Sequence, residues 1–482
     1  MATTFLVTSI TLLLVALKKY LDYREAVKSV QNHPGFRTLF SSFGVLNQIL
    51  FRVPIPGVSV GSFRHWRAKH ADFEYFGVDI ISHVNPAAAK EITAHRARFP
   101  KPVEYYGALS FFGRNIVASE GEEWKRYRKV TAPAFSEPNN KLVWDETDSL
   151  HHVSTDIVLK ILCPDWFLQY APIKRLNTCK LAYDELEVFL PQLLFIRAEA
   201  DTKRLKKFML DMVASRRNAE KKEDRYDLFS SLLDASEDEM DGGGKLTDRE
   251  LLGWPSHCYD ATHTDGLRTQ GISSYSYLQT TAHTLCFTFA LLAIYQEEQE
   301  ILYQHIKSVL TDDRLPKYED MNKLTQSTAV FYETLRMYPP VTEIPKVSAE
   351  DTALTTQNSA GETVIVPIPQ GTSITLHVAG VHYNPRYWDD PTAFKPARFL
   401  SDWPRDAFLP FSGGARACLG RRFFETEGIA ILTMLISKYK IEIKDEPEFA
   451  AESFEEKKAR ILQGRQGLTL TPVHMPLVFK RR

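Results

Sequence analysis

Apolar residues recur at steps of three and four through much of the middle of the chain, which predicts helices over 205–218 and 223–234. The same period predicts one strongly amphipathic helix, with apolar positions at Ala282, Leu285, Cys286, Phe289, Leu292 and Ala293. Beyond the proline pair at 339–340 the pattern changes to short strand-like pieces at 363–368 and 373–378, cut by proline and glycine. The pattern therefore predicts a mostly α protein with a small β region.

The chain opens with an apolar run at 5–17 that is followed at once by Lys18 and Lys19. The run is short for a bilayer span, which takes about 20 residues, so a cleaved secretory peptide is the rival interpretation. It lacks the basic start and the small-residue cleavage site of such peptides. We therefore predict a membrane anchor at 1–19, and the positive-inside tendency places residues 20–482 on the cytoplasmic side.

Composition narrows the possible functions. The 482 residues are 44% hydrophobic, which is enough for a large globular core. The 59 basic and 60 acidic residues nearly cancel, so we expect no nucleic-acid partner. The five cysteines include no Cys-x-x-Cys pair, which argues against a disulfide framework and against a zinc cluster. A single cysteine in a special setting remains possible.

The setting is the segment 411–420, which reads Phe-Ser-Gly-Gly-Ala-Arg-Ala-Cys-Leu-Gly and precedes a helical pattern at 421–438. One interpretation is a buried structural cysteine beside a glycine-rich turn. The segment, however, resembles the haem-binding loop of the cytochrome P450 family, Phe-x-x-Gly-x-Arg-x-Cys-x-Gly, at every fixed position. The resemblance implies that Cys418 is the axial thiolate ligand of a haem b iron, where a thiolate assists cleavage of the O–O bond.

The other fixed residues of the loop also receive roles from the resemblance. Arg416 would bind a haem propionate, and Phe411 would pack against the sulfur side. Gly414 and Gly420 would permit tight backbone turns next to the porphyrin. The positive end of the helix that follows Cys418 favours thiolate over thiol.

A second motif is the pair Glu333 and Arg336 in a predicted helix at 331–338 that ends at two prolines. Taken alone, the pair is an ordinary surface ion pair worth about 0.2 to 0.5 kcal/mol. In a chain that also carries the haem-loop motif, the pair resembles the Glu-x-x-Arg helix of the family. In the family, this ion pair joins an arginine from a later segment. That segment is identified as 396–399, Pro-Ala-Arg-Phe, and it is preceded by His-Tyr-Asn-Pro at 382–385.

Three further residues complete the haem contacts that the resemblance implies. Trp124 and Arg128 lie one helical turn apart and resemble the Trp-x-x-x-Arg helix of the family, in which both side chains contact a propionate. The alternative for this pair is an amphipathic surface helix in a Glu/Lys-rich stretch. Lys346 follows the Glu-x-x-Arg helix at a spacing where relatives keep another propionate-binding base.

One part of the sequence departs from the family. The distal helix should carry Ala/Gly-Gly-x-Asp/Glu-Thr-Thr, with the acid and Thr relaying protons. Thr280 and the threonine after it are present, but Ser-Tyr-Leu-Gln at 276–279 replaces the small residues and the acid. A phenol at Tyr277 would occupy space over the iron, and Gln279 cannot cycle a proton. The abrupt change at 254–279 suggests a retained non-coding stretch in the gene.

The resemblance implies the mostly α cytochrome P450 fold with a small β region, incomplete or distorted around 145–165, 188–200 and 254–279. It implies a monooxygenase that inserts one oxygen atom of O₂ into a lipophilic substrate, with Thr280 in proton delivery and electrons from NADPH–cytochrome P450 reductase. The anchor implies the endoplasmic reticulum membrane, with the catalytic domain facing the cytoplasm. Two alternatives stay open: a haem-binding protein without monooxygenase activity, and a defective product that does not fold.

Overall fold

The computed structural model describes 75–77, 80–83, 86–110, 114–149, 277–311, 314–357, 362–466 and 469–482, with residue 214 and scattered positions between 10 and 28. The chain divides into two compact units. We call them the sheet unit, which comprises Met1–Pro102, Leu335–Phe394 and Asp402–Cys418, and the helical unit, which comprises Val103–Thr334, Lys395–Ser401 and Leu419–Arg482.

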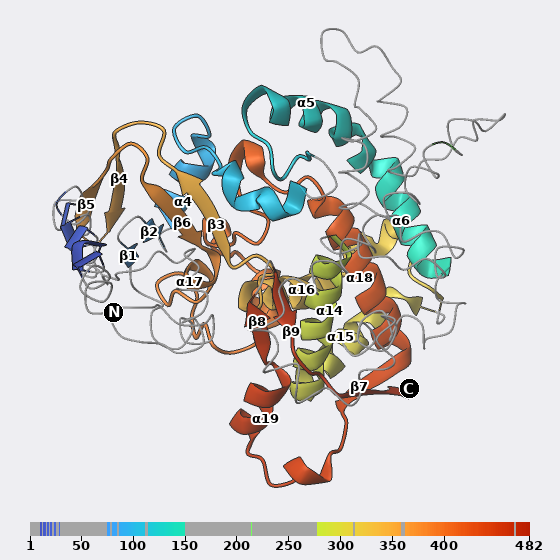
Figure 1. Cartoon of the computed structure of the whole chain (residues 1–482). Helices are drawn as coiled ribbons and strands as arrows, with labels where there is room; N and C mark the ends of the chain where they lie inside the picture. Colours follow the sequence, from blue (N-terminus) through green and yellow to red (C-terminus); the bar gives the residue numbers. More distant parts are fainter. Residues whose placement is uncertain are drawn as a thin grey trace. The chain divides into compact units, whose positions relative to one another are not determined.

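The sheet unit is built on a four-stranded sheet with the strand order β1-β2-β6-β3 (Figure 1). Strands β2 and β6 are parallel, and the other two pairs are antiparallel. Strands β4 and β5 form a separate antiparallel hairpin. The elements of this unit are β1 (Tyr75–Gly77), β2 (Ile80–His83), α4 (Pro86–Ala94), β3 (Glu343–Val347), β4 (Thr352–Gln357), β5 (Thr363–Ile368), β6 (Ser373–His377), α17 (Val378–His382), and the 3₁₀ turns η8 (Arg405–Ala407) and η9 (Gly414–Arg416).

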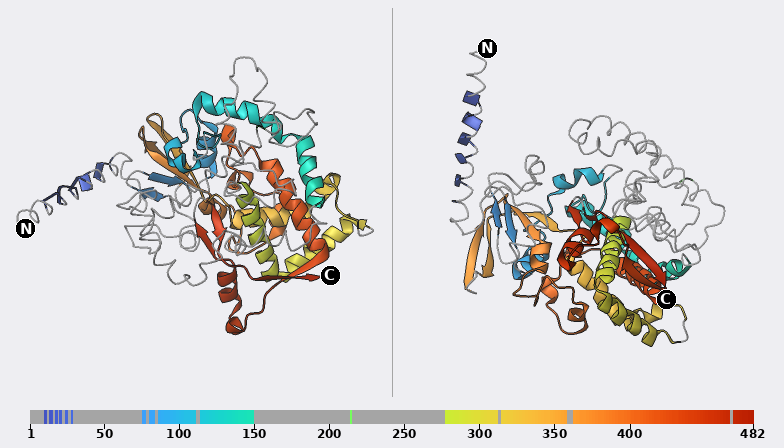
Figure 2. Two further views of the ribbon diagram at one scale, coloured as in Figure 1. Left: turned by 45° about the vertical axis from the view of Figure 1, so that its right-hand side comes forward. Right: turned by 90° about the horizontal axis from the view of Figure 1, so that it is seen from below.

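The helical unit is centred on three helices, α14, α15 and α18, which pack on one another (Figures 1 and 2). Its strands form two antiparallel pairs, β7 with β10 and β8 with β9. Its elements are η1 (Val103–Ser110), α5 (Gly121–Thr131), η2 (Ala132–Phe135), α6 (Glu137–Ser149), α14 (Tyr277–Ile294), α15 (Gln296–Val309), η6 (Tyr318–Lys323), α16 (Thr325–Met337, of which the last three residues belong to the sheet unit), η7 (Pro396–Leu400), α18 (Arg421–Lys438), β7 (Tyr439–Ile443), η10 (Pro447–Phe449), α19 (Phe454–Ile461), β8 (Gly464–Gln466), β9 (Leu470–Pro472) and β10 (Leu477–Arg481).

Helix α14 corrects one sequence expectation, because it is not amphipathic. Every residue from Thr284 to Ala293 is buried, so no polar stripe faces solvent. Two threonines are accommodated because their hydroxyls donate to the backbone one turn earlier: Thr284 to the carbonyl of Thr280 at 2.8 Å, and Thr288 to that of Thr284 at 2.7 Å. A helix that is apolar on all sides belongs in a core.

Aromatic packing joins α16 to α18 within the helical unit. The rings of Phe331 and Phe424 lie 5.2 Å apart, centroid to centroid. Gly428 of α18 makes room for this contact, since a Cβ there would lie 2.2 Å from the Phe331 ring. The helix that begins just after the Cys418 loop is therefore packed tightly on the Glu-x-x-Arg helix.

Most of the predicted elements that can be compared are confirmed. The predicted strand at 363–368 coincides with β5, and the helical pattern at 421–438 coincides with α18. The second predicted strand is one residue too long, because Val378 already begins α17. The predicted helices at 205–218 and 223–234, and the unusual segments at 188–200 and 254–276, lie outside the described residues, residue 214 apart.

The described positions near the amino terminus are helical and exposed, with Leu13 71% and Leu14 59% accessible. Across the described residues, none of the helices combines the length and the apolar character that crossing a bilayer requires. The anchor at 1–19 therefore stays a prediction.

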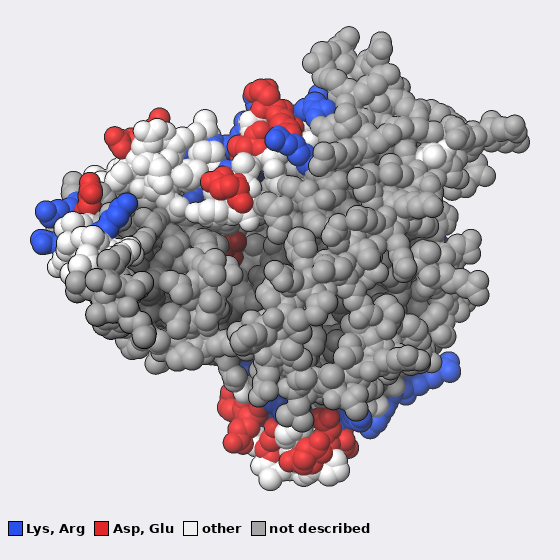
Figure 3. All heavy atoms as spheres, in the orientation of Figure 1, with Lys and Arg blue, Asp and Glu red and all other residues white. Residues whose placement is uncertain are grey.

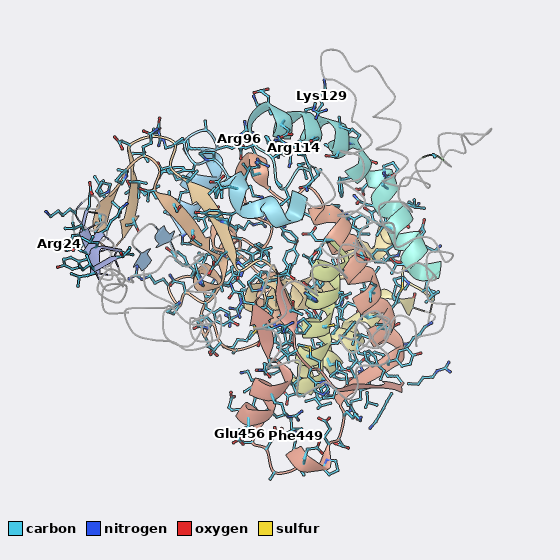
Figure 4. The ribbon with its side chains drawn as sticks, in the orientation of Figure 1. Arg24, Arg96, Arg114, Lys129, Phe449 and Glu456 are labelled. Carbon is cyan, nitrogen blue, oxygen red and sulfur yellow. The ribbon has the colours of Figure 1, made fainter. Side chains whose placement is uncertain are left out.

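The η10–α19 segment carries exposed acidic side chains, including Glu448, Glu455 and Glu456, which gather at the lower edge of the space-filling view (Figure 3). Figure 4 labels Phe449 and Glu456 on this segment. The Arg460 guanidinium lies 3.9 Å from the centre of the Phe449 ring. Ser453 and Glu456 form a capping box that begins α19.

Candidate functional site

The loop that carries Cys418 is closed by its own backbone. The N–H of Cys418 donates to the carbonyl of Phe411 at 2.9 Å, and the N–H of Ala417 donates to that of Gly414 at 3.0 Å. The Phe411 side chain is buried, whereas Cys418 is a reduced, exposed thiol. The loop therefore presents a sulfur atom at the surface of the sheet unit from a fixed backbone.

Gly414 holds this loop against α4. Its φ is +60°, in the left-handed region that favours glycine. A Cβ at this position would lie 2.1 Å from the carbonyl oxygen of Thr93, near the end of α4. Gly420 differs, because its φ of −83° is one that any residue adopts. The backbone conformation therefore requires glycine at position 414 but not at position 420, and the close approach of Gly420 to a porphyrin stays a prediction.

His382 connects the start of the loop segment to α16. Its Nδ1 lies 3.0 Å from the carbonyl oxygen of Arg336, and its Nε2 accepts from the N–H of Leu409 at 2.9 Å. Because Nε2 accepts, the proton is on Nδ1, which donates to Arg336. Burial and the Arg336 cation lower the pKa of His382 to about 3, so the ring stays neutral.

Arg336 holds the segment between His382 and the loop through backbone carbonyls. Its Nη1 donates to the carbonyls of His382 at 2.8 Å and Pro391 at 2.9 Å. Its guanidinium also lies 5.5 Å from the ring centres of both Tyr383 and Trp388. The buried charge is thus surrounded by oxygen acceptors and aromatic faces, and it fixes a segment that has little regular secondary structure.

The Glu-x-x-Arg helix also makes the expected link to the later arginine. Arg398 Nε donates to Glu333 Oε1 at 3.2 Å, and the N–H of Lys395 donates to the same oxygen at 2.9 Å. The Glu333 side chain is fully buried and that of Arg398 is 10% exposed. A buried pair of this kind fixes geometry more than it adds net stability. The prediction that Glu333 pairs with an arginine of 396–399 is confirmed.

The two basic residues of the sheet unit that were predicted to bind haem propionates, Arg416 and Lys346, lie on different elements. Arg416 ends η9, two residues before Cys418, and is half-buried. Lys346 lies on β3 opposite Ile374 of β6 and is buried. The sequence motif thus brings Phe411, Arg416 and Cys418 together in one loop, and Lys346 is placed on the neighbouring sheet.

In the helical unit, Trp124 and Arg128 share one face of α5. Trp124 is buried, and the Arg128 guanidinium lies 5.8 Å from its ring centre. The first turn of α5 carries acidic residues and the last turn basic ones, which suits the helix dipole. Arg114 and Lys129 are labelled in Figure 4, and Arg114 pairs with Glu123 at 2.9 Å.

Thr280 lies in the first turn of α14, which begins at Tyr277. Next to it, Thr281 is buried and hydrogen-bonded to Glu427 of α18. Desolvation raises the pKa of Glu427 to about 7, although the Thr281 hydroxyl opposes this rise. One turn further on, burial lowers the pKa of His283 to about 4.

Comparisons with known proteins identify the family of this chain. Residues 278–467 match the family model described as "Cytochrome P450". "Cytochrome P450 monooxygenase 124" of the fungus Postia placenta is 46% identical, and the alignment covers 99% of this chain and all of that protein. The chain belongs to the cytochrome P450 family. It is also 25% identical to "Cytochrome P450 monooxygenase ORF6" of Penicillium roqueforti, over 78% of each protein.

The fold agrees as well. The crystal structure of the "cytochrome P450DA heme domain" matches with a TM-score of 0.61 at 19% identity, over 85% of this chain and 89% of that one. The predicted P450 fold, mostly α with a small β region, is therefore confirmed. The alignment with the Postia protein spans 553 positions, so that relative contains segments without a counterpart among the 482 residues of this chain.

The residues of this P450 fit a haem with a thiolate ligand. Such a group needs one accessible thiol on a rigid loop and cationic or N–H donors for its propionates. Cys418 supplies the thiol, and Arg416 is the donor nearest to it in the chain. As a P450, the protein uses haem with a cysteine thiolate ligand and is an oxidoreductase that incorporates oxygen from O₂. That this cysteine is Cys418 stays a prediction. The propionate roles of Trp124, Arg128 and Lys346 stay predictions.

The sequence motifs did not point to several residues that support the P450 site. Thr93 supports the haem loop from more than 300 positions away, and Glu427 meets Thr281 from another helix. Glu427 is the seventh residue of α18, nearly two turns after the helix begins, where a carboxylate looks like an ordinary helix residue. A helix-face plot of 421–438 would have placed Glu427 among buried apolar neighbours and marked it as unusual.

Proposed function

We propose that this P450 oxygenates a lipophilic small molecule at the cytoplasmic face of the endoplasmic reticulum membrane, with electrons from NADPH–cytochrome P450 reductase. The observation that carries the oxygenation is the exposed Cys418 thiol on its clamped loop. The membrane location is supported by the apolar run at 5–17, in which the described leucines are helical and exposed, and by Lys18 and Lys19 after it.

The protein residues divide the work of the site. When bound, haem supplies the activation of O₂. Cys418 would give the iron its thiolate ligand, and Phe411 would pack against the sulfur side. Arg416, Trp124, Arg128 and Lys346 would hold the propionates through charge-assisted hydrogen bonds. Thr280 would hold a proton at its hydroxyl for delivery during the reaction.

The distal helix decides how well the proton step proceeds. The position of the family acid is occupied by Gln279, which cannot take up and release a proton at neutral pH. The described part of α14 is nevertheless regular from Tyr277 onward. Reduced efficiency in coupling electron use to product formation is the expected consequence, with electrons lost to peroxide.

Reduction of the purified protein under carbon monoxide tests the site. We expect the thiolate-type Soret band in the full-length chain and its loss in Cys418→Ser at equal protein concentration. An unchanged band in Cys418→Ser contradicts the assignment of the ligand. A band without substrate-dependent NADPH use identifies a haem protein that is not an oxygenase, and failure to take up haem identifies a product that does not fold.

The membrane proposal has its own test. The full-length chain should float with neutral phospholipid vesicles, and a Leu13→Lys, Leu14→Lys variant should float less because two charges enter the apolar run. Equal flotation of the two proteins contradicts the anchor.

A further inference from the structure

Three side chains of the helical unit form a closed hydrogen-bonded triangle between α16 and α18. Tyr332 Oη donates to Glu425 Oε1 at 2.6 Å, and Arg421 Nε donates to the same oxygen at 2.8 Å. Arg421 Nη2 also donates to Tyr332 Oη at 3.1 Å. Glu425 is buried, whereas the Arg421 side chain is 50% exposed. We call these three residues the Arg421 triangle.

Tyr332 is firmly placed, so the triangle has a rigid base. Its ring meets that of Phe399 edge-on, with the centroids 5.6 Å apart. Phe399 follows Arg398, whose partner Glu333 is the neighbour of Tyr332. Burial and the Glu425 carboxylate raise the pKa of Tyr332 to about 12, so the phenol keeps its proton and donates it. The triangle thus extends the Glu333–Arg398 pair into α18.

The charge of Arg421 stands in an unusual place. The first turn of α18 contains Arg421 and Arg422 and no acidic residue. A helix N-terminus carries a partial positive charge and ordinarily attracts acidic side chains, so a cation there is unfavourable by itself. Glu425, one turn later, offsets this charge. The Arg421 cation and the Glu425 carboxylate together set the net charge at the N-terminus of α18.

The start of α18 is also close to the thiolate along the chain. Arg421 is three residues after Cys418, and three residues span at most about 11 Å between Cα atoms. Over distances on the order of 10 Å, a unit charge in a protein of effective dielectric about 20 still contributes measurably. A cation there favours the state of the iron site with one more electron, and an anion disfavours it.

We propose that Tyr332 and Glu425 hold and partly neutralise the Arg421 cation, and that this triangle tunes the reduction potential of the haem iron bound by Cys418. The proposal rests on the binding of haem by Cys418. Reduction adds one electron from the external donor to the ferric site and no proton to the triangle. Arg421, Glu425 and Tyr332 act as positioning residues and touch neither haem nor substrate in this proposal.

The test is a redox titration of the full-length haem protein with mediators, in which two substitutions should act with opposite signs. Arg421→Gln removes the cation and should lower the potential. Glu425→Gln removes the carboxylate charge that faces the cation and should raise the potential. We expect each to change the equilibrium constant for reduction by about twofold to tenfold, where tenfold corresponds to about 59 mV for a one-electron couple. The double variant should return toward the unsubstituted protein.

Two controls separate this role from a merely structural one. Tyr332→Phe removes one hydroxyl without changing the charge, so its shift should be smaller than either charge variant. Glu448→Gln removes an exposed carboxylate on η10 and should leave the potential unchanged. Loss of packing alone would move Arg421→Gln and Glu425→Gln in the same direction.

The outcomes are distinguishable through the carbon-monoxide band, recorded on every sample. A retained thiolate band with shifts of the same sign, or with no shift in either charge variant, overturns the triangle proposal and leaves the function intact. A missing band in the unsubstituted chain overturns the proposed function and this proposal with it. Opposite shifts with the band retained support the proposal.

Discussion

Replacement of Gly414 by alanine should disrupt the haem loop more than its small size suggests. The substitution places a Cβ at φ +60°, which costs about 1 to 2 kcal/mol for a residue other than glycine. It also places that Cβ 2.1 Å from the Thr93 carbonyl oxygen, where the neighbouring atoms are backbone and cannot rotate away. Forced displacement in packed structure adds about 1 to 3 kcal/mol. We expect the free energy of unfolding to fall by roughly 2 to 5 kcal/mol.

Gly371 provides the matched control within the same unit. Its φ of +80° imposes the same kind of backbone penalty, but a Cβ there meets nothing within 4 Å. Gly371→Ala should therefore lower the free energy of unfolding by only about 1 to 2 kcal/mol. Urea unfolding of both variants, with haem content measured on the same preparations, gives the difference that belongs to the contact with Thr93.

Haem content should follow the same order. Gly414→Ala should bind little haem and lack the thiolate-type carbon-monoxide band, because the loop moves off α4 and takes the sulfur with it. Gly371→Ala should keep both. If the two variants unfold at the same urea concentration and bind equal haem, the contact between the loop and α4 does not position the sulfur.

Two pH-dependent predictions concern the buried His382 and the half-buried Glu427, and their signs are opposite. His382 has a folded pKa of about 3 against 6.5 in the unfolded chain, so its contribution to stability is lost as pH falls below 6.5, by up to about 1.4 kcal/mol per pH unit. His382→Gln should flatten this loss in urea titrations between about pH 7 and 5, and an equal slope in both proteins contradicts the neutral-ring assignment. Glu427 has a folded pKa of about 7 against 4.5, so its contribution is present below pH 4.5 and lost as pH rises through 7. The free energy of unfolding of Glu427→Gln should therefore exceed that of the unsubstituted protein by up to about 3 kcal/mol above pH 7 and should equal it near pH 4.5. A difference that does not vary with pH would contradict the raised pKa of Glu427.

The sequence predicted best the features that depend on neighbouring residues. The helical pattern of α18 is bounded by Gly420 at one end and by β-branched strand residues at the other, and both limits were placed correctly. Strand β5 was likewise bounded by local turn signals. The family motif located Cys418 and Arg416 because each fixed residue answers a local demand of backbone geometry or charge.

What the sequence could not give was the set of distant partners. Nothing near Thr93 indicates that its carbonyl oxygen faces Gly414, and nothing near Tyr332 indicates Glu425 and Arg421. The misjudged polarity of α14 has the same origin. Its threonines look like a polar stripe in a periodicity count, but their hydroxyls are satisfied within the helix, so the stripe needs no solvent.

The haem loop itself illustrates why a short motif can identify a family while leaving its support invisible. Its closing bond joins two backbone groups, the atom of α4 beside Gly414 is the backbone carbonyl oxygen of Thr93, and the group that His382 contacts is the backbone N–H of Leu409. Backbone groups are the same in every residue, so the supporting positions are free to vary in type as long as their backbone stays in place. Only positions where a side chain or its absence is essential, such as Gly414 and Cys418, leave a trace in the sequence. Substitutions that move the backbone of α4 without touching the motif should therefore impair haem binding as much as substitutions inside it.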